Sequence, residues 1–394
     1  AATPMLLLYN FGPKIRKEFS KGLSLTEFIK KRFGLGVLKI SLFLILFYLT
    51  IFLIAEVTAI AFLINFISNT PLWITAGITL IICLLYILKG GFKLSVITDK
   101  YQFCFIILII LTSVFLIFEK IDFSAHELIK QNSPNLVDSN YLPNYTSGLT
   151  FFIAVAATNL FHQGNWQRVY AAKNFETLRK SLIISFFTIV PIVFYMGFTG
   201  MVAFSIDSST RPDLGFFSLL LKEQKEILSL IVIILGLALT ISTVDTLVNA
   251  ISSLIVIDGK ATFNLNKKTN LFNFSKYLIV FLSIVSFIIA SKGFDILYLF
   301  LLADLFCCAF VLTVFYSFYD KSINEKVAYL SIIIGLIGGF LIFPTPDFSK
   351  SLLVGILISK DLFPPFVSQS LLFLSFVVAT FLPLLVLKAK KIVY

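Results

Sequence analysis

Long runs of apolar residues dominate the chain and alternate with short segments that carry nearly all of its charges. A helix rising about 1.5 Å per residue needs about 20 such residues to cross some 30 Å of hydrocarbon. Ten runs are predicted to span the membrane: 38–67, 72–88, 102–118, 149–163, 181–204, 226–257, 277–291, 293–318, 327–344 and 366–387. The pattern therefore predicts an all-α polytopic membrane protein, with one transmembrane domain over residues 1–394.

Two further segments complete the predicted organisation. The apolar stretch 5–12 is too short to span and has no basic flank like that of a signal peptide. We expect it to be the end of a helix that begins before Ala1, so that the sequence is an N-terminally truncated part of a longer protein. The connection 119–148 is predicted to be a long external loop, with a short surface helix at 123–130.

Composition and charge place the chain in the bilayer and orient it. Hydrophobic residues make up 58% and charged residues 13%, with a mean hydropathy of +0.96, which excludes an ordinary soluble enzyme. Alternating the connections across the membrane puts 24 of the 32 basic residues on one side and 8 on the other. By the positive-inside rule the richer side is cytoplasmic, so the net charge of +11 reflects topology and not nucleic-acid binding. The cytoplasmic segments are then 13–39, 89–101, 164–180, 258–276, 321–326 and the tail from 388.

Three acidic residues lie inside the predicted spans: Glu56, Asp245 and Asp304. A carboxylate at mid-depth costs about 2.5 to 3.5 kcal/mol on insertion scales, so each one needs a partner, an ion or a water-filled cavity. No lysine or arginine is predicted near mid-membrane to neutralise them. This favours a mobile cation as partner, while protonation or pairing with polar neighbours remains the alternative.

The span 226–257 carries polar side chains at steps of three and four residues, which places them on one helix face. Hydroxyl and carbonyl oxygens on such a face suit an alkali cation, although hydroxyls in membrane helices also serve helix packing alone. The polar positions are Ser242, Asp245, Thr246, Asn249, Ser252 and Ser253.

The span 149–163 runs into a polar segment interrupted by Gly164. Broken spans are where transporters expose backbone groups to solutes, so Asn159, His162 and Gln163 are candidates for a solute path. Trp166 and Arg168 are instead interpreted as markers of the cytoplasmic interface.

Four segments together resemble the sodium:solute symporter family, in family order and over nearly the whole chain. They are LSLTEFIKKRFG (23–34), KGGFKLSVITDKYQ (89–102), WQRVYAAK (166–173) and ISTVDT (241–246). The form of the third is similar to the urea-type and uncharacterised bacterial branches. The resemblance implies a LeuT-like fold of five plus five inverted helices, with ion and solute bound halfway across the membrane.

The resemblance also implies roles for individual residues. Sodium would bind the hydroxyls of Ser242 and Thr243 and the carbonyl of Leu239. Gln163 would bind solute, and Glu56 and Asp304 would lie on helices that reach the cavity. Because the first core helix of the family is missing from this sequence, we expect the chain alone to lack half of its ion site and to be unable to transport.

We therefore expect a secondary active symporter that couples sodium entry to uptake of a small polar organic solute. It would be a multi-pass protein of the cell membrane with a cytoplasmic C-terminus, with sodium as its only metal and no organic cofactor, nucleic acid or obligate protein partner. The alternatives are proton coupling through Glu56, Asp245 or Asp304, and a transporter-like solute sensor. An enzyme is not expected, because the chain contains no HExxH, GxSxG or phosphate-loop motif.

Overall fold

The chain is almost entirely helical. The computed structural model describes residues 2–19, 22–120, 125–221, 226–262 and 270–393, and the side chains of these residues except 86–92, 94, 118–120, 260–262 and 390–393. No strand occurs in the described ranges; there are isolated bridges and three short 3₁₀ turns. The α-helices are α1 (Thr3–Glu18), α2 (Leu25–Phe33), α3 (Leu35–Ser68), α4 (Leu72–Lys120), α5 (Ala125–Asn132), α6 (Leu142–Phe161), α7 (Gln163–Ala171), α8 (Phe175–Ile206), α9 (Gly215–Leu221), α10 (Glu226–Thr262), α11 (Leu271–Ala290), α12 (Ile296–Tyr316), α13 (Glu325–Ile342), α14 (Pro365–Gln369) and α15 (Leu371–Val393).

Eight stretches of helix in the described residues are long and apolar enough to cross a membrane, which supports a multi-pass protein. They are Leu35–Ser68, Ser95–Ile117, Phe175–Ile206, Glu226–Gly259, Leu271–Ala290, Ile296–Tyr316, Glu325–Ile342 and Leu371–Ala389. Two predicted spans, 72–88 and 149–163, fall outside this set: the apolar helix Leu72–Leu85 is shorter, and the second lies within the more polar α6. The count of ten stays a prediction.

Helix α4 differs from the prediction of two spans joined by a loop. It runs for 49 residues and contains both predicted spans, so the connection 89–101 is helical. The sequence there has two adjacent glycines but no proline, and glycine weakens a helix by only about 1 kcal/mol each. Asp99 is therefore held in a fixed position on a helix and not in a loop.

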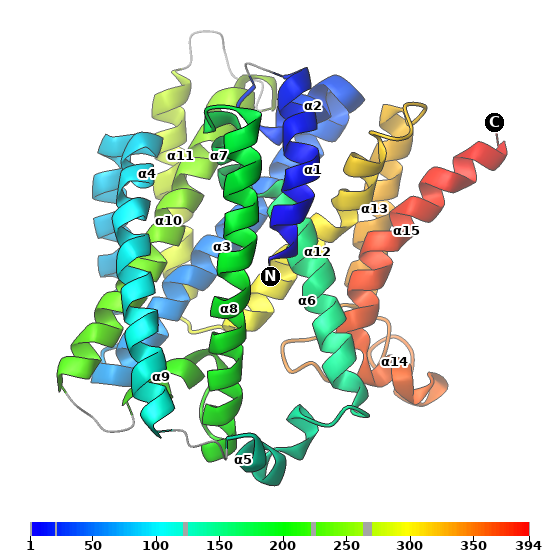
Figure 1. Ribbon diagram of the computed structural model, residues 1–394. Coiled ribbons are helices and arrows are strands. Elements are labelled where there is room, and N and C mark those ends of the chain that lie inside the picture. The colour runs from blue at the N-terminus through cyan, green and yellow to red at the C-terminus, as the bar shows by residue number, and fades with distance from the viewer. Residues whose placement is uncertain (1, 20–21, 121–124, 222–225, 263–269, 394) are drawn as a thin grey trace.

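The segments predicted to be cytoplasmic gather at one end of the molecule, at the top of Figure 1, where α2, α7 and the start of α13 lie. The opposite end holds α5, α9 and α14. The predicted external connection 119–148 contains α5, close to the expected surface helix, but its last residues already belong to α6. The grouping agrees with the alternation of basic and less basic connections.

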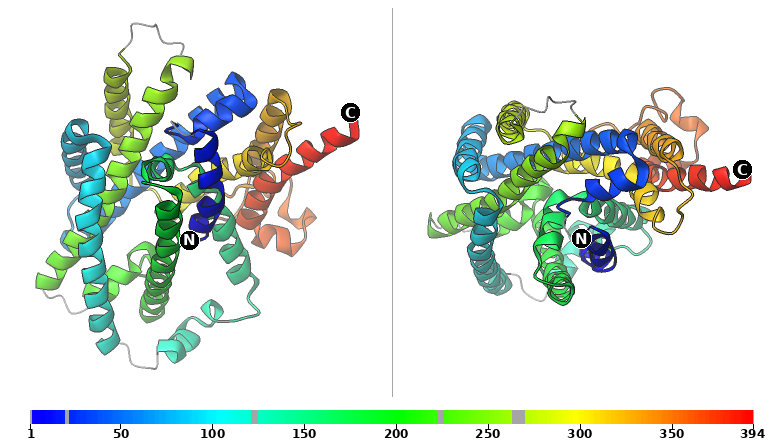
Figure 2. Two further views of the ribbon diagram at one scale, coloured as in Figure 1. Left: turned by 45° about the horizontal axis from the view of Figure 1, so that its top comes forward. Right: turned by 90° about the horizontal axis from the view of Figure 1, so that it is seen from above.

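The most buried helices are α3 and α12, which pack against each other and cross the centre of the molecule (Figure 2). Helix α10 packs along α3 and also touches α4, α7 and α11, while α6 packs on α12. Polar N-caps fix where several helices begin, since a side-chain oxygen satisfies an otherwise unpaired N–H. These caps are Asn174 for α8, Asn270 for α11, Asp295 for α12 and Asn324 for α13.

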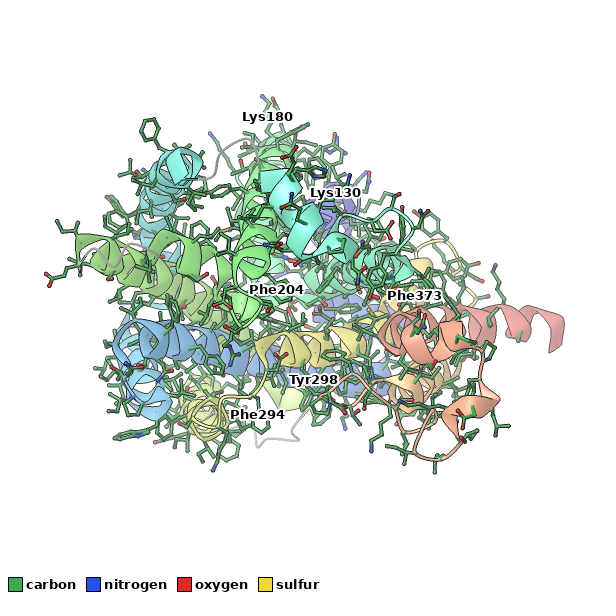
Figure 3. The ribbon with its side chains drawn as sticks, turned by 90° about the horizontal axis from the view of Figure 1, so that it is seen from below. Lys130, Lys180, Phe204, Phe294, Tyr298 and Phe373 are labelled. Atoms are coloured by element: carbon green, nitrogen blue, oxygen red, sulfur yellow. The ribbon has the colours of Figure 1, made fainter. Side chains whose placement is uncertain are left out.

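The outer end of α12 is anchored by aromatic contacts. The Tyr298 ring lies 5.5 Å from Phe343 and 6.0 Å from Phe348, and its hydroxyl donates to the carbonyl of Pro344 at 3.2 Å. Figure 3 looks onto this end of the molecule, where Phe294 and Tyr298 are labelled. These contacts tie the connection after α13 to the helix that carries Asp304.

Small residues allow α13 and α15 to pack closely. A Cβ at Gly335 would lie 2.5 Å from Pro383 Cγ and 2.9 Å from the Ala379 carbonyl oxygen, and one at Gly339 would lie 2.8 Å from Ala379 Cβ. In lipid, such close approach of backbones is a main source of attraction between helices.

We predict that Gly335→Ala forces α13 away from α15 and lowers the melting temperature of the purified protein. The matched control is Gly197→Ala in α8, where nothing lies within 4 Å of the added methyl group. Because alanine favours a helix over glycine, the control should leave the melting temperature unchanged or slightly raised. Equal melting curves for the two variants would contradict this account.

Candidate ion and solute site

A break in the helical chain lies between α6 and α7. His162 leaves the helical conformation with φ −68° and ψ 107°, so α6 ends at Phe161 and α7 starts at Gln163. The His162 ring caps α7, since Nδ1 accepts a hydrogen bond from the Gly164 N–H at 3.1 Å. The sequence prediction put the interruption at Gly164, but Gly164 is helical and the break falls at His162.

Gly164 is required for the contact between α7 and α10. A Cβ at this position would lie 2.6 Å from Cγ2 of Thr246, which is closer than real Cβ atoms approach. The first turn of α7 therefore touches α10 at its polar face. The glycine singled out in the sequence permits this close approach and does not itself unwind the helix.

The predicted sodium ligands lie together on α10. The Thr243 hydroxyl donates to the Leu239 carbonyl at 3.2 Å, so these two oxygens can contact one ion. The Ser242 hydroxyl points instead to α4, where it donates to Oδ1 of Asp99 at 2.7 Å. A carboxylate is thus part of the site.

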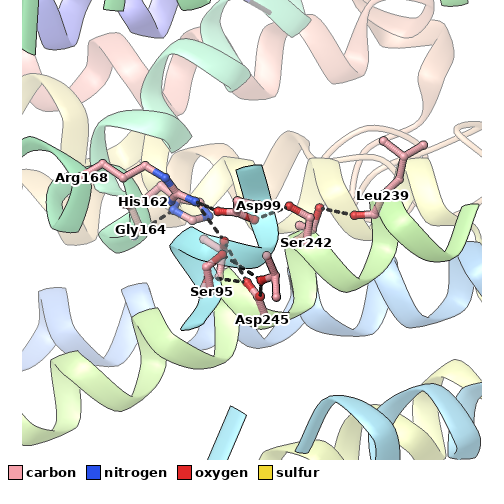
Figure 4. A network of polar contacts seen from close by, with 11 residues as sticks. Ser95, Asp99, His162, Gly164, Arg168, Leu239, Ser242 and Asp245 are labelled. Atoms are coloured by element: carbon pink, nitrogen blue, oxygen red, sulfur yellow. Dashed lines mark hydrogen bonds and ion pairs between the residues drawn. The ribbon is translucent and has the colours of Figure 1, made fainter. Parts of the chain in front are cut away.

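Asp99 and Arg168 are the residues that sequence reasoning missed (Figure 4). Arg168 Nη2 lies 2.8 Å from Oδ2 of Asp99 and 3.2 Å from the Thr246 hydroxyl, and Nη1 donates to the Gly164 carbonyl at 3.2 Å. The ion pair is partly exposed, at 43% for Arg168 and 22% for Asp99, so solvent screens it and it contributes little to stability by itself. Its effect is to join α4, α7 and α10 at one carboxylate.

Asp245 forms a second carboxylate centre beside the first. Its side chain is fully buried and accepts hydrogen bonds from Ser95 at 2.7 Å and from Thr98 at 3.4 Å. Hydrogen-bond donors on α4 thus satisfy the acid that the sequence placed in mid-membrane. Asp245 and Asp99 are linked through the contacts of Thr246 and Arg168.

The missed residues had weak signals in the sequence. Asp99 lies in a family-like segment, but that segment was interpreted as a loop, and its partner Ser242 is 143 residues away. The interpretation of Trp166 as an interface marker was wrong: its side chain is fully buried, and Nε1 donates to the Leu160 carbonyl at 2.7 Å, inside the fold. An arginine just after a broken span is the signal that could have indicated an acidic partner for Arg168.

The three candidate solute residues have different surroundings. The Asn159 amide bonds to the Val155 carbonyl and to Asn165, so its polar groups serve the break itself. Gln163 is 1% exposed, and its Nε2 donates to the Leu23 carbonyl at 2.9 Å and to the Ser253 hydroxyl at 3.3 Å. His162 uses Nδ1 for the cap, and Nε2 has no partner in the described part of the chain.

The other two predicted acids lie away from the Asp99 centre. Asp304 on α12 is 5% exposed and accepts a hydrogen bond from Thr158 on α6 at 2.7 Å. Glu56 on α3 is partly exposed and forms no hydrogen bond or ion pair with the described residues. The structure therefore separates the acids into one group on α4 and α10 and another on α3 and α12.

Comparison with protein-family models gives one match, to the sodium:solute symporter family, over residues 2–335. The chain belongs to the sodium:solute symporter family. Membership in this family confirms the resemblance predicted from the four sequence segments.

Two individual proteins resemble this chain. The spermidine transporter DUR31 of Candida albicans is 27% identical over 326 residues, which cover 81% of this chain but about 60% of that transporter. A Na⁺-coupled sialic acid symporter, solved in a substrate-bound outward-open state with a novel Na⁺ site, superimposes with a TM-score of 0.70 at 16% identity, over 100% of this chain and 82% of its own. The structural match confirms the predicted LeuT-like fold.

The geometry predicts that Gln163 holds the cytoplasmic side closed. In Gln163→Leu the Leu23 carbonyl and the Ser253 hydroxyl lose their donor, which weakens the links from α7 to the segment before α2 and to α10. A cysteine placed at the neighbouring Ser252, which Gln163 does not contact, should then react several-fold faster with a thiol reagent applied from the cytoplasmic side, in the absence of solute. The control is Gln167→Leu, which loses only a 3.4 Å contact to the Asn249 carbonyl. Equal reactivity of the cysteine in the two variants would contradict the role of Gln163 in closing this side.

Proposed function

We propose that the intact protein is a secondary active symporter of the cell membrane, in which sodium entry drives uptake of a small polar organic solute. The observation that carries this is the set of oxygens on α10 that faces a carboxylate on α4, directly beside the break between α6 and α7. Family membership supports solute transport, and the contacts of the described residues support the choice of ion.

The proposed sodium site combines the Leu239 carbonyl, the hydroxyls of Ser242 and Thr243, and the carboxylate of Asp99. Oxygen ligands of these kinds suit a hard cation. A cation at this position would neutralise the negative charge of Asp99, whose other neighbours are a hydroxyl and one partly exposed arginine. Arg168 donates to one oxygen of Asp99 and Ser242 donates to the other, so the lone pairs of the Ser242 and Thr243 hydroxyl oxygens can still be offered to an ion.

The membrane potential gives this arrangement its driving force. One positive charge crossing about 100 mV releases about 2.3 kcal/mol, before any concentration gradient is counted. If sodium and solute both stabilise the same outward-open state, each raises the affinity of the other by the same factor. Alternating access then carries both to the cytoplasm, on the side where α2 and α7 lie.

The first solute to test is spermidine, because the relative DUR31 is named as a spermidine transporter. This chain spans about 60% of that protein, so its substrate is carried over here as a proposal. Urea is the neutral comparison solute, since the segment 166–173 is similar to the urea-type branch of the family.

We expect Ser242→Ala, Thr243→Ala and Asp99→Asn to raise the sodium concentration for half-maximal uptake about tenfold or more, with smaller effects on solute affinity at saturating sodium. Each change removes an ion ligand or its charge. The measurement is uptake of labelled solute by cells or proteoliposomes that contain the intact protein, as a function of sodium. Ser286→Ala is the control, because Ser286 is a buried hydroxyl that also bonds to the carbonyl four residues back, on α11.

Two outcomes would remove the sodium assignment. One is unchanged sodium dependence in all three variants. The other is full uptake in sodium-free medium driven by a pH gradient, which would make the protein a proton-coupled transporter of the same fold. Binding of solute without any uptake would favour a sensor.

A further inference from the structure

A buried carboxylate, that of Asp304, lies beside α6, the first half of the broken helix. Asp304 is on α12, near the middle of a helix that is among the most buried of the fold, and its carboxylate is 5% exposed. Among the described residues, its hydrogen-bond donor is the Thr158 hydroxyl, which lies one turn before the end of α6. A carboxylate with one neutral donor keeps most of its acceptor capacity unused.

The surroundings of Asp304 favour a positive charge. No lysine or arginine among the described residues forms an ion pair with it. Thr158 lies in the last turn of α6, whose C-terminal end carries the negative end of the helix dipole. Arg168, on the other half of the broken helix, is paired with Asp99.

A tyrosine hydroxyl without a partner lies beside this carboxylate. Tyr48 on α3 is fully buried, and its hydroxyl has no hydrogen-bond partner. Tyr48 lies at the level of Asp304 where α3 packs on α12, between the ring contact of Phe47 with Phe306 at 4.8 Å and that of Phe52 with Phe300 at 4.7 Å. The Tyr48 ring also meets the His162 ring edge to face at 6.2 Å. A buried hydroxyl without a partner costs about 1–3 kcal/mol, which a ligand at this point would recover.

A small cavity lies one turn away from Asp304 along α12. It has a volume of about 10 Å³ and is lined by Cys307, by Phe161, Phe306 and Phe310, and by Ser41, whose hydroxyl has no partner among the described residues; Asp304 and Tyr48 lie outside its lining. This volume is about that of one water molecule, and an ammonium group is of similar size. Aromatic faces attract such a cation.

We propose that Asp304, Tyr48 and the C-terminal end of α6 form a recognition subsite for an alkylammonium group of the solute, so that the transported solute is an organic cation. The subsite rests on the proposed function, since it is part of the solute path of the symporter. Ammonium N–H groups donate to the carboxylate and to the tyrosine oxygen. A neutral solute of the same length leaves the carboxylate without a counter-charge and binds more weakly.

The subsite also explains why sodium is not its ligand. Among the described residues, the Thr158 hydroxyl is the hydrogen-bond partner of Asp304, so this carboxylate lacks the several hard oxygens that would replace the hydration shell of a metal ion. The oxygen-rich site at Asp99 and Ser242 is the better sodium site. Ion and solute thus have separate carboxylates.

The test compares spermidine and urea as substrates of Asp304→Asn in the intact protein. The Thr158 hydroxyl still donates to the asparagine oxygen, so the fold is kept. We expect the KM for spermidine to rise at least tenfold, with no change in the half-maximal sodium concentration or the melting temperature. Asp295→Asn, on the same helix, is the control: asparagine still caps α12, and the kinetics should match those of the wild type.

A second variant tests the tyrosine without changing any charge. Tyr48→Phe should raise the KM for spermidine several-fold and leave kcat and the sodium dependence nearly unchanged. Tyr195→Phe, whose hydroxyl bonds to Ser113 on α4, is its matched control. Asp304→Glu, which keeps the charge, should restore part of the affinity for spermidine that Asp304→Asn loses.

The outcomes separate this inference from the proposed function. Sodium-driven uptake of spermidine with an unchanged KM in Asp304→Asn overturns the subsite and leaves the symporter intact. An equal rise in the KM for spermidine and for urea in that variant shows a structural role of Asp304 and also overturns the subsite. Sodium-driven uptake of urea that spermidine does not inhibit overturns the subsite as well. Wild-type protein without any sodium-dependent uptake overturns the proposed function itself.

Discussion

A bilayer gives a buried carboxylate nothing to bind except what the protein places beside it. The contacts of three acids therefore indicate how the helices are arranged. Asp245 is satisfied by hydroxyls of α4, Asp99 by a hydroxyl of α10 and a guanidinium of α7, and Asp304 by one hydroxyl of α6. The first two arrangements draw three helices together. The third leaves acceptor capacity of the carboxylate unused, and the proposed alkylammonium subsite lies there.

The broken helix connects the two carboxylate regions. Its second half, α7, touches α10 at Gly164 and reaches Asp99 through Arg168. Its first half, α6, bonds to α12 through Thr158 and Asp304. The two halves meet at His162. If the proposed ion and solute sites are correct, ion and solute would act on this break from opposite sides, which is a physical route to the reciprocal coupling of the proposed symport.

Hydrophobic periodicity was sufficient to predict the helical class, the location of the eight spanning helices found in the described residues, and the polar face of α10. These features depend on residues close in sequence. The family resemblance supplied Leu239, Ser242 and Thr243, which the structure brings together. Pairs such as Asp99 with Ser242 could not be predicted, because the pairing depends on how α4 and α10 pack over a separation of 143 residues. The burial of Trp166 was missed for a related reason. An aromatic residue close to a basic one is typical of a membrane interface. The hydrogen bond from Trp166 to the Leu160 carbonyl, which holds the ring inside the fold, forms only because the chain turns at His162.

Arg168 links the proposed ion site to the broken helix. Its guanidinium pairs with Asp99 and also bonds to the Thr246 hydroxyl and the Gly164 carbonyl. In the proposed mechanism, a sodium ion bound between Ser242 and Asp99 would neutralise part of the carboxylate charge and so weaken the attraction between Arg168 and Asp99. Because Arg168 belongs to α7, the link between α7 and α4 would then loosen while the contact of Gly164 with α10 remained. The ion pair is partly exposed, so its free energy is small enough for one bound cation to shift it.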